Sequence, residues 1–182
     1  KSLNLVYENN MVKYSINNNL NTWFELPDDF NLVIRNGDER GIWFKNRRYA
    51  GELRVSLNDK KLYVINHLKL EKYLKSVVGS EMPKEFPLAA LQAQAIAART
   101  YALKVLDTNK LFDLHSSQDS QVYLGLESET EKTNRAVRST SRLALFYQND
   151  LIEAVFHSSS GGRTENSGQV WKYQLPYLKS VI

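Results

Sequence analysis

The sequence predicts an α+β fold in which a β-rich amino-terminal lobe packs against a mixed lobe with a central buried helix. In residues 1–66, short runs of alternating, β-branched and aromatic residues are separated by turns that contain Asn, Asp or Gly. In residues 88–105, apolar side chains recur at steps of three and four, the period of a helix with one buried face. We therefore expect a single domain over residues 1–182, with a β-rich lobe at 1–66 and a second lobe at 67–182.

The first lobe is expected to form a small antiparallel β unit. Hairpin turns are expected at 36–38 (Asn-Gly-Asp) and 58–59 (Asn-Asp), because these residue types tolerate the backbone of tight turns. In the second lobe, residues 143–156 are expected to return to strand, with a turn at 148–150. The predicted strands of the first lobe cover residues 4–7, 11–16, 31–35, 41–44, 51–57 and 61–65.

A helical region is expected from Leu68 to about Leu106, and its second part is almost free of charge. Between Phe86 and Leu103 the only charged residue is Arg99, so this helix should be covered on most sides. Pro87 suits its first turn, where a missing N–H removes no helical bond. Its polar residues need partners, and pairs seven residues apart share faces of the helix: Gln92 with Arg99, and Gln94 with Tyr101.

Composition excludes several classes of site. The chain contains no cysteine, so it has neither a disulfide framework nor a thiolate metal site. Its net charge of +4 comes from scattered Lys and Arg, which argues against a nucleic-acid surface. No apolar run approaches the roughly 20 residues that span a bilayer, and Lys1 begins without an initiator Met or a signal-like segment. We expect a trimmed chain without a transmembrane segment.

Glu81 is the most informative single residue. It is the carboxylate of a Ser-Glu-Met-Pro sequence that is expected to form a turn before the uncharged helix. Taken alone, it would be expected to cap that helix or to pair with a lysine.

Separated blocks of sequence follow an order that is typical of one known family. The first is YLKSVVGSEMP…FPLAALQAQAIAARTYAL at residues 73–103. The later blocks are 120–123 with Gly125, 157–165, 170–171 and 176–178, and the amino-terminal part fits more loosely through 49–53, 64–66 and 70–74. Together they resemble the SpoIID/LytB family, named for a sporulation cell-wall enzyme and an amidase enhancer. The resemblance covers most of the chain, and three separated blocks in the matching order make chance similarity a poor explanation.

The resemblance implies a lytic transglycosylase, the activity of the family's enzyme members. These enzymes cut the β-1,4 bond between N-acetylmuramic acid and N-acetylglucosamine in peptidoglycan strands, here expected to be peptide-stripped. The C6 hydroxyl of the sugar attacks and leaves a 1,6-anhydro end. Glu81 would act as the acid and then as the base, so one carboxyl group suffices. A glycoside hydrolase usually needs a second carboxylate, for which Glu85 is the obvious candidate, although a solvated charge is its simpler explanation.

The predicted position of Glu81 carries a physical tension. A carboxylate close to a helix N-terminus is stabilised in its ionised form, whereas a general acid must hold its proton. We therefore expect Glu81 to lie in a partly apolar cleft, near Met82 and aromatic side chains. Its carboxyl group should be turned away from the free N–H groups of the helix.

The resemblance also nominates substrate-binding residues. In the polar loop 157–165, hydroxyls, exposed amides and a neutral imidazole suit sugar recognition, whereas a merely ordered turn is the alternative. A Ser-His hydrolytic site is disfavoured there, since no Gly-x-Ser-x-Gly pattern is present. The nominated set is Gln94, Arg99, Gln121, Tyr123, His157, Ser158, Ser159, Ser160, Gly161, Gly162, Thr164 and Glu165.

Four of these residues have a structural alternative. Arg99 lies about 18 Å beyond Pro87 along a straight helix, so it should not reach Glu81 and is structural or adjacent to substrate. Gln94 lies nearer but could only brace the loop. Gln121 and Tyr123 could present an amide and an aromatic platform from one face of a strand, or form a satisfied interior pair.

No cofactor is expected. Some family members bind zinc through a Cys and His cluster just before Gln-Val-Tyr. Residues 113–120 offer only His115 and Asp119 here, so we expect no tightly bound zinc.

The expected partners are peptidoglycan glycan strands and a cell-wall amidase. The alternative function is that of a non-catalytic, glycan-binding enhancer of an N-acetylmuramoyl-L-alanine amidase. The expected location is extracytoplasmic, in the cell wall or secreted, with any anchor encoded upstream. Because family members commonly continue beyond residues 176–178, we expect the chain to be truncated at its C-terminus.

Overall fold

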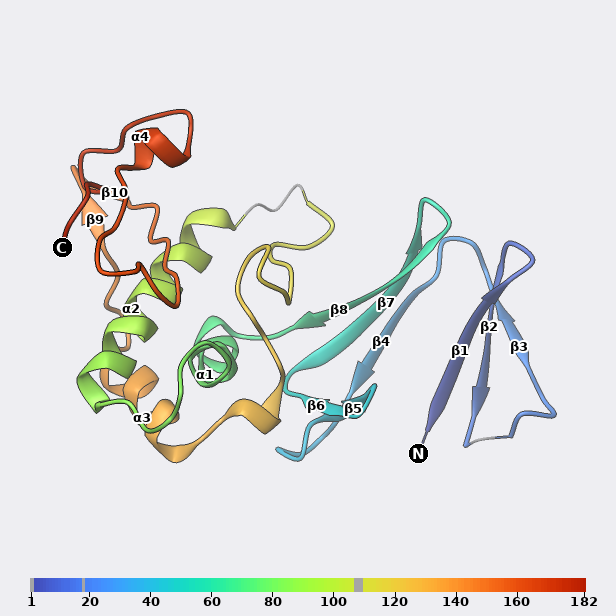
Figure 1. Cartoon of the computed structure of the whole chain (residues 1–182). Helices are drawn as coiled ribbons and strands as arrows, with labels where there is room; N and C mark the ends of the chain where they lie inside the picture. Colours follow the sequence, from blue (N-terminus) through green and yellow to red (C-terminus); the bar gives the residue numbers. More distant parts are fainter. Residues whose placement is uncertain (1, 18, 107–109) are drawn as a thin grey trace.

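The computed structural model describes residues 2–17, 19–106 and 110–182, and it confirms the α+β class (Figure 1). One antiparallel sheet has the order β1-β2-β3. A second has the order β4-β7-β8, and β5 pairs with β6 in a separate hairpin. The bounds are β1 Leu3–Glu8, β2 Met11–Ile16, β3 Phe24–Leu26, β4 Asn31–Arg35, β5 Ile42–Phe44, β6 Arg47–Tyr49, β7 Glu52–Asn58 and β8 Lys61–His67. The predicted strands of the first lobe are thus confirmed.

The two three-stranded sheets share a small apolar core. Val12 of β2, Phe30 and Val55 of β7 are its buried members. Alternate residues of β4 and β8 pack against them, as the period-2 pattern of these segments predicts. The β1–β3 sheet lies on the outer side of the β4–β7–β8 sheet, away from the helices (Figure 1).

One of the two predicted hairpin turns lies within one residue of the observed turn, and the other prediction is wrong. The β7–β8 ladder closes on Asn58 and Lys61, so the turn consists of Asp59 and Lys60, one residue later than expected, with positive φ at both. The Asn-Gly-Asp at 36–38 joins β4 to β5, which belong to different sheets. It is a connection, in which the Asn36 side chain bonds Asp38 and the Gly41 carbonyl, and not a hairpin turn.

Helices form most of the second lobe. They are α1 Leu70–Glu81, α2 Leu88–Val105, the 3-10 turn η1 Leu126–Ser128, α3 Glu131–Ser139 and α4 Ser167–Val170. The stripe Leu91, Ala95, Ala98 and Ala102 of α2 is fully buried against α1 and α3, which confirms the central buried helix. None of the described helices is long and apolar enough to cross a membrane.

The two lobes meet through a row of aromatic rings. The ring centroids of Tyr49, which ends β6, and Tyr123 are 5.9 Å apart, and Tyr123 lies 5.2 Å from Tyr73 of α1. Beside this row, Arg48 of β6 forms an ion pair of 2.7 Å with Glu127 of η1. Such contacts fix the position of the segment 121–125 between the sheet and α1.

The prediction of long strands within 143–156 is wrong. Only β9 Phe146–Tyr147 and β10 Asp150–Leu151 are strands, joined by the predicted turn at Gln148 and Asn149. The preceding residues bind α2 instead: the Leu145 N–H donates to the Thr100 hydroxyl at 2.9 Å. The remaining C-terminal segment lies above and to the left of the C-terminal half of α2 in Figure 1. Backbone hydrogen bonds between Thr164 and Val181 and between Ser167 and Leu178 close it into a loop.

Gly79 allows α1 to approach η1 closely, and this leads to a stability prediction. A Cβ at Gly79 would lie 2.0 Å from the Ser128 carbonyl oxygen. We expect Gly79→Ala to lower the free energy of unfolding by about 1–3 kcal/mol, because the overlap outweighs the higher helix propensity of Ala. Urea unfolding measures this. Gly37→Ala, with no atom within 4 Å of the added methyl group, should change stability little; equal effects would contradict the prediction.

Candidate active site

Glu81 is the last residue of α1, which corrects the expectation of a turn before α2. The turn follows at Met82–Pro87, and the exposed Glu85 lies in it, where its backbone carbonyl accepts a 3.3 Å bond from the Lys132 ammonium. Glu81 therefore lies at the carboxyl end of one helix and not at the amino end of the next. At this end of a helix the dipole does not stabilise the ionised carboxylate, so the expected conflict with a general-acid role does not arise.

The carboxyl group of Glu81 is fixed through one oxygen. Its Oε1 accepts a 2.6 Å hydrogen bond from the backbone N–H of Val122, and the residue is half-buried. The described residues make no other hydrogen bond or ion pair with this carboxyl group. A fixed carboxyl group with one unused oxygen is able to exchange a proton with a bound molecule.

The Val122 amide is itself held by buried side chains on both sides. Gln121, fully buried, donates through Nε2 to the Ala98 carbonyl of α2 at 3.2 Å and accepts a 3.0 Å bond from the Tyr73 hydroxyl. The Tyr123 hydroxyl donates to Asn66 Oδ1 of β8 at 2.6 Å. Segment 121–123 is thus attached to α1, α2 and the sheet, and the Val122 N–H is directed at Glu81.

The environment next to Glu81 is of low polarity. Burial, with smaller contributions from the Glu81 carboxylate and Tyr101, raises the pKa of the Tyr73 phenol. Burial likewise raises the pKa of Tyr123, helped by Tyr49, Glu129 and Tyr73. Both phenols therefore keep their protons at any working pH and act as hydrogen-bond donors. Buried aromatic rings thus belong to the network that holds the Glu81 carboxyl group, and a partly apolar cleft around that group stays a prediction.

Gln121 and Tyr123 are hydrogen-bonded interior residues, which is one of the two alternatives that the sequence leaves open; the other is a sugar-binding platform. They are not in a strand, because residues 121–125 have irregular backbone, and Tyr123 is only 6% exposed. Tyr73, Asn66 and the Val122 amide belong to the same network and were not singled out from the sequence. No local pattern predicts a backbone amide that meets a carboxylate 41 positions away.

Arg99 is a structural residue in this geometry. Its side chain is 2% exposed and forms a bidentate pair with Glu71 of α1, with N–O distances of 2.7 and 2.9 Å. It also donates to the carbonyls of Ala95, Val137 and Leu143. These bonds join α1, α2, the end of α3 and the chain that follows it.

Gln94 remains a candidate for ligand contact. Its Nε2 is buried and has no hydrogen-bond partner among the described residues. A buried amide donor without a partner is uncommon in a native protein, so Gln94 is a site where a ligand or water would restore a bond.

The polar loop 157–165 is exposed and is not brought to Glu81 by any described hydrogen bond or ion pair. Two of its hydroxyls bond within the loop: those of Ser159 and Ser160 accept from the N–H groups of Gly161 and Gly162, respectively. Both glycines have positive φ, the backbone conformation that favours Gly. Thr164 ties the loop to Val181. A glycan-binding role for this loop stays a prediction.

The loop 113–120 carries no group of metal ligands. Among the described residues, no three His, Asp or Glu side chains lie close enough together to hold an ion. Asp119 instead accepts a 2.8 Å bond from the Ser117 hydroxyl, and the His115 ring packs edge-on against Phe112.

Comparisons with known proteins match the region that contains this site. A sequence model of SpoIID, the stage II sporulation protein, matches residues 58–147. The stage II sporulation protein D of Bacillus subtilis is 37% identical over 134 residues, covering 64% of this chain and 39% of that protein. The amidase enhancer of the same organism is 42% identical over 105 residues, covering 58% of this chain and 14% of that protein. An uncharacterised protein of Brachyspira hyodysenteriae is 35% identical over 161 residues, covering 87% of this chain and 40% of that protein.

These relatives are longer than the chain. It spans 40% of the Brachyspira protein and 39% of the Bacillus sporulation protein. The family model nevertheless covers α1 with Glu81, the whole of α2 and the segment 121–123 that holds the Glu81 carboxyl group. The matched region thus contains the residues that build this site, and the chain belongs to the SpoIID/LytB family.

Proposed function

We propose that this chain is a peptidoglycan lytic transglycosylase that acts outside the cytoplasmic membrane. The observation that carries the proposal is the Glu81 carboxyl group, half-buried, fixed at Oε1 by the Val122 N–H and unused at its second oxygen. The names of the relatives, a sporulation protein and an amidase enhancer, support a role at the cell wall. A chain with a net charge of +4 also suits anionic cell-wall polymers.

One carboxyl group is sufficient for the proposed reaction. Protonated Glu81 donates its proton to the glycosidic oxygen, and the bond from C1 of N-acetylmuramic acid to that oxygen breaks. The C6 hydroxyl of the same sugar then attacks C1 and forms the C1–O6 bond, and its proton passes to the Glu81 carboxylate. Glu81 ends as it began, and no water is consumed.

The hydrogen bond from Val122 determines which oxygen takes part. Because Oε1 accepts the backbone N–H, the transferable proton belongs on Oε2. A fixed donor of this kind removes the need to orient the carboxyl group in each turnover. Glu85 is exposed, and no described contact joins it to Glu81, so a hydrolase with two carboxylates has no support from this arrangement.

A second candidate function is that of a glycan-binding amidase enhancer. It is favoured by the amidase enhancer of Bacillus subtilis, which is 42% identical over 105 residues. In this case the chain would hold a strand for a separate cell-wall amidase and leave it uncut.

Mass spectrometry of glycan strands incubated with the protein separates these functions. Strands stripped of peptide stems and strands that retain them should be tested in parallel. Products lighter by one water than hydrolysis products would support lytic cleavage, with peptide-free strands as the better substrate. Strands that stay intact, but that increase the rate of an added amidase, would favour the enhancer function.

The hydroxyl of Tyr73 provides a prediction about positioning. Tyr73→Phe removes the donor to Gln121 and should lower stability by about 1 kcal/mol. We expect kcat to fall by about three- to tenfold with little change in KM, because the segment that orients Glu81 loosens. Tyr177→Phe is the control, since its hydroxyl accepts a bond from the Glu153 N–H away from Glu81. Equal kcat in the two variants at equal stability would contradict a positioning role.

A further inference from the structure

A cavity of about 480 Å³ lies between the C-terminal turns of α2 and the loop 110–120. Its walls include Tyr101 and Val105 of α2 and Phe112, His115 and Ser120 of the loop. The volume is in the range of sites for small molecules. None of the substrate-binding residues predicted from the sequence lines this cavity.

The cavity adjoins the site of Glu81. Ser120, on one wall, precedes Gln121 and Val122, and the Val122 N–H binds Glu81. Two extended residues span about 7 Å at most, so the wall and the Val122 amide are close together. Tyr101, another wall residue, lies on α2, which packs against α1, the helix that ends at Glu81. The cavity and the carboxyl group are therefore neighbours.

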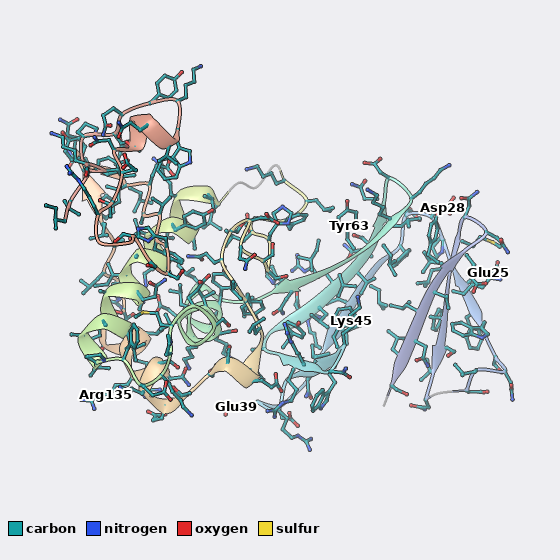
Figure 2. All side chains as sticks on the ribbon, in the orientation of Figure 1. Glu25, Asp28, Glu39, Lys45, Tyr63 and Arg135 are labelled. Carbon is teal, nitrogen blue, oxygen red and sulfur yellow. The ribbon has the colours of Figure 1, made fainter. Side chains whose placement is uncertain are left out.

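The loop that forms one wall of the cavity is held by its own hydrogen bonds. The His115 N–H donates to the Ser120 hydroxyl at 3.1 Å, and the Tyr123 N–H donates to the Ser116 carbonyl at 3.2 Å. Tyr63 of β8, labelled in Figure 2, lies at the end of the β7–β8 hairpin that faces this loop. Its ring centroid is 6.4 Å from that of Phe112, which in turn packs edge-on against His115 at 4.8 Å. The cavity is thus formed before any ligand arrives.

The lining combines aromatic rings with polar groups that have no partner. Among the described residues, neither the Tyr101 hydroxyl nor the ring nitrogens of His115 make a hydrogen bond. Tyr101 and Phe112 offer apolar ring faces. A sugar ring has C–H groups on its faces and hydroxyl and acetamido groups at its edge, so it can use both kinds of surface.

We propose that this cavity is a saccharide subsite that binds an N-acetylated hexosamine of the glycan strand. The sugar would lie next to the bond that Glu81 cleaves, and the cavity would set the register of the strand over that bond. This inference rests on the proposed function for its choice of ligand and for the role of Glu81. The existence of a saccharide site in the cavity is tested separately from cleavage.

The test is a calorimetric titration with the β-1,4-linked tetramer of N-acetylglucosamine, carried out in a Glu81→Gln protein so that no turnover occurs. Phe112→Ala removes one ring wall, and Val105→Phe fills the cavity while it keeps the loop intact. Each should raise Kd at least about tenfold, because each removes aromatic contact or space at the centre of the site. Trp23→Ala is the control, since Trp23 lines a separate small hollow beside β1 and β2, and its Kd should stay unchanged.

The outcomes separate the two proposals. Tetramer binding that Val105→Phe weakens supports the subsite even if the active protein cuts no strand. An unchanged Kd in Val105→Phe and Phe112→Ala overturns the subsite, and lytic cleavage by Glu81 would still stand if anhydro products form. Absence of any tetramer binding to the Glu81→Gln protein without further substitutions also overturns the subsite. Circular dichroism of each variant verifies that a raised Kd does not come from unfolding.

Discussion

Replacing Glu81 with Gln is expected to reduce strand cleavage about 10²- to 10⁴-fold while strand binding stays within about twofold, the range that loss of a general acid or base produces. The Gln side chain has nearly the same size, and its amide oxygen is able to accept the Val122 N–H in place of Oε1. It is unable to give or take a proton at the second position. Initial rates from chromatography of the products, with Kd measured on the same strands, test both parts of this prediction.

The matched control for Glu81→Gln is Glu85→Gln. Glu85 loses the same charge four residues later, on an exposed turn, and its side chain makes no described hydrogen bond or ion pair. Cleavage by this variant should be close to that of the parent protein. If Glu85→Gln abolished cleavage and Glu81→Gln did not, the assignment of the acid and base to Glu81 would be wrong. Equal loss in both would indicate a hydrolase with two carboxylates.

Replacing Arg99 with Met should have the largest effect on stability. The guanidinium group is 2% exposed and makes bonds to Glu71 and to three backbone carbonyls. Met fills a similar volume but leaves these acceptors without a donor, which costs about 3 kcal/mol or more. The Glu71 carboxylate is 42% exposed and is able to find water, so it adds little to that cost. Equilibrium unfolding in urea measures the change.

Arg138→Met is the control for this prediction. Arg138 pairs with Glu131 on the exposed side of α3, where its side chain is 53% exposed. Exposed ion pairs contribute about 0–1 kcal/mol, so the variant should unfold almost as the parent does. A similar loss in both variants would mean that general charge balance, and not the buried network of Arg99, stabilises the fold.

Regular periodicity made most of the fold predictable. In β4 and in the first half of β7, more buried and more exposed residues alternate, and the stripe from Leu91 to Ala102 on α2 repeats at the helical period. Such patterns arise because each element buries one face, whatever the remote contacts are. The β7–β8 turn is predictable to within one residue because Asn and Asp are among the few residue types that tolerate a positive φ, and Asp59 has one.

Features that depend on remote partners were not predictable. The apolar run 143–147 predicts a strand, yet only Phe146–Tyr147 pairs in a sheet. The Leu143 carbonyl and the Leu145 N–H instead bond to the side chains of Arg99 and Thr100 on α2. Similarly, Glu81 was expected beside the N-terminus of α2, because Pro83 and Pro87 both suggest a boundary and the sequence does not say which residue ends the previous helix.

The candidate site was predictable only at its central residue. Family resemblance pointed to Glu81, but the atoms that fix its carboxyl group are a backbone N–H and the side chains that hold this amide in place. Backbone donors are common to every residue, so no residue type marks Val122. The burial of Gln121 and Tyr123 likewise follows from the packing of α1, α2 and the sheet around them.

The measurement that tests the central claim most directly is mass spectrometry of peptide-free strands cleaved in water enriched in oxygen-18. If Glu81 serves as both acid and base for an internal hydroxyl, each new end carries an anhydro sugar and contains no heavy oxygen. Incorporation of one heavy oxygen at each new reducing end would show that water attacks, and it would contradict the account of a single carboxyl group that works without water.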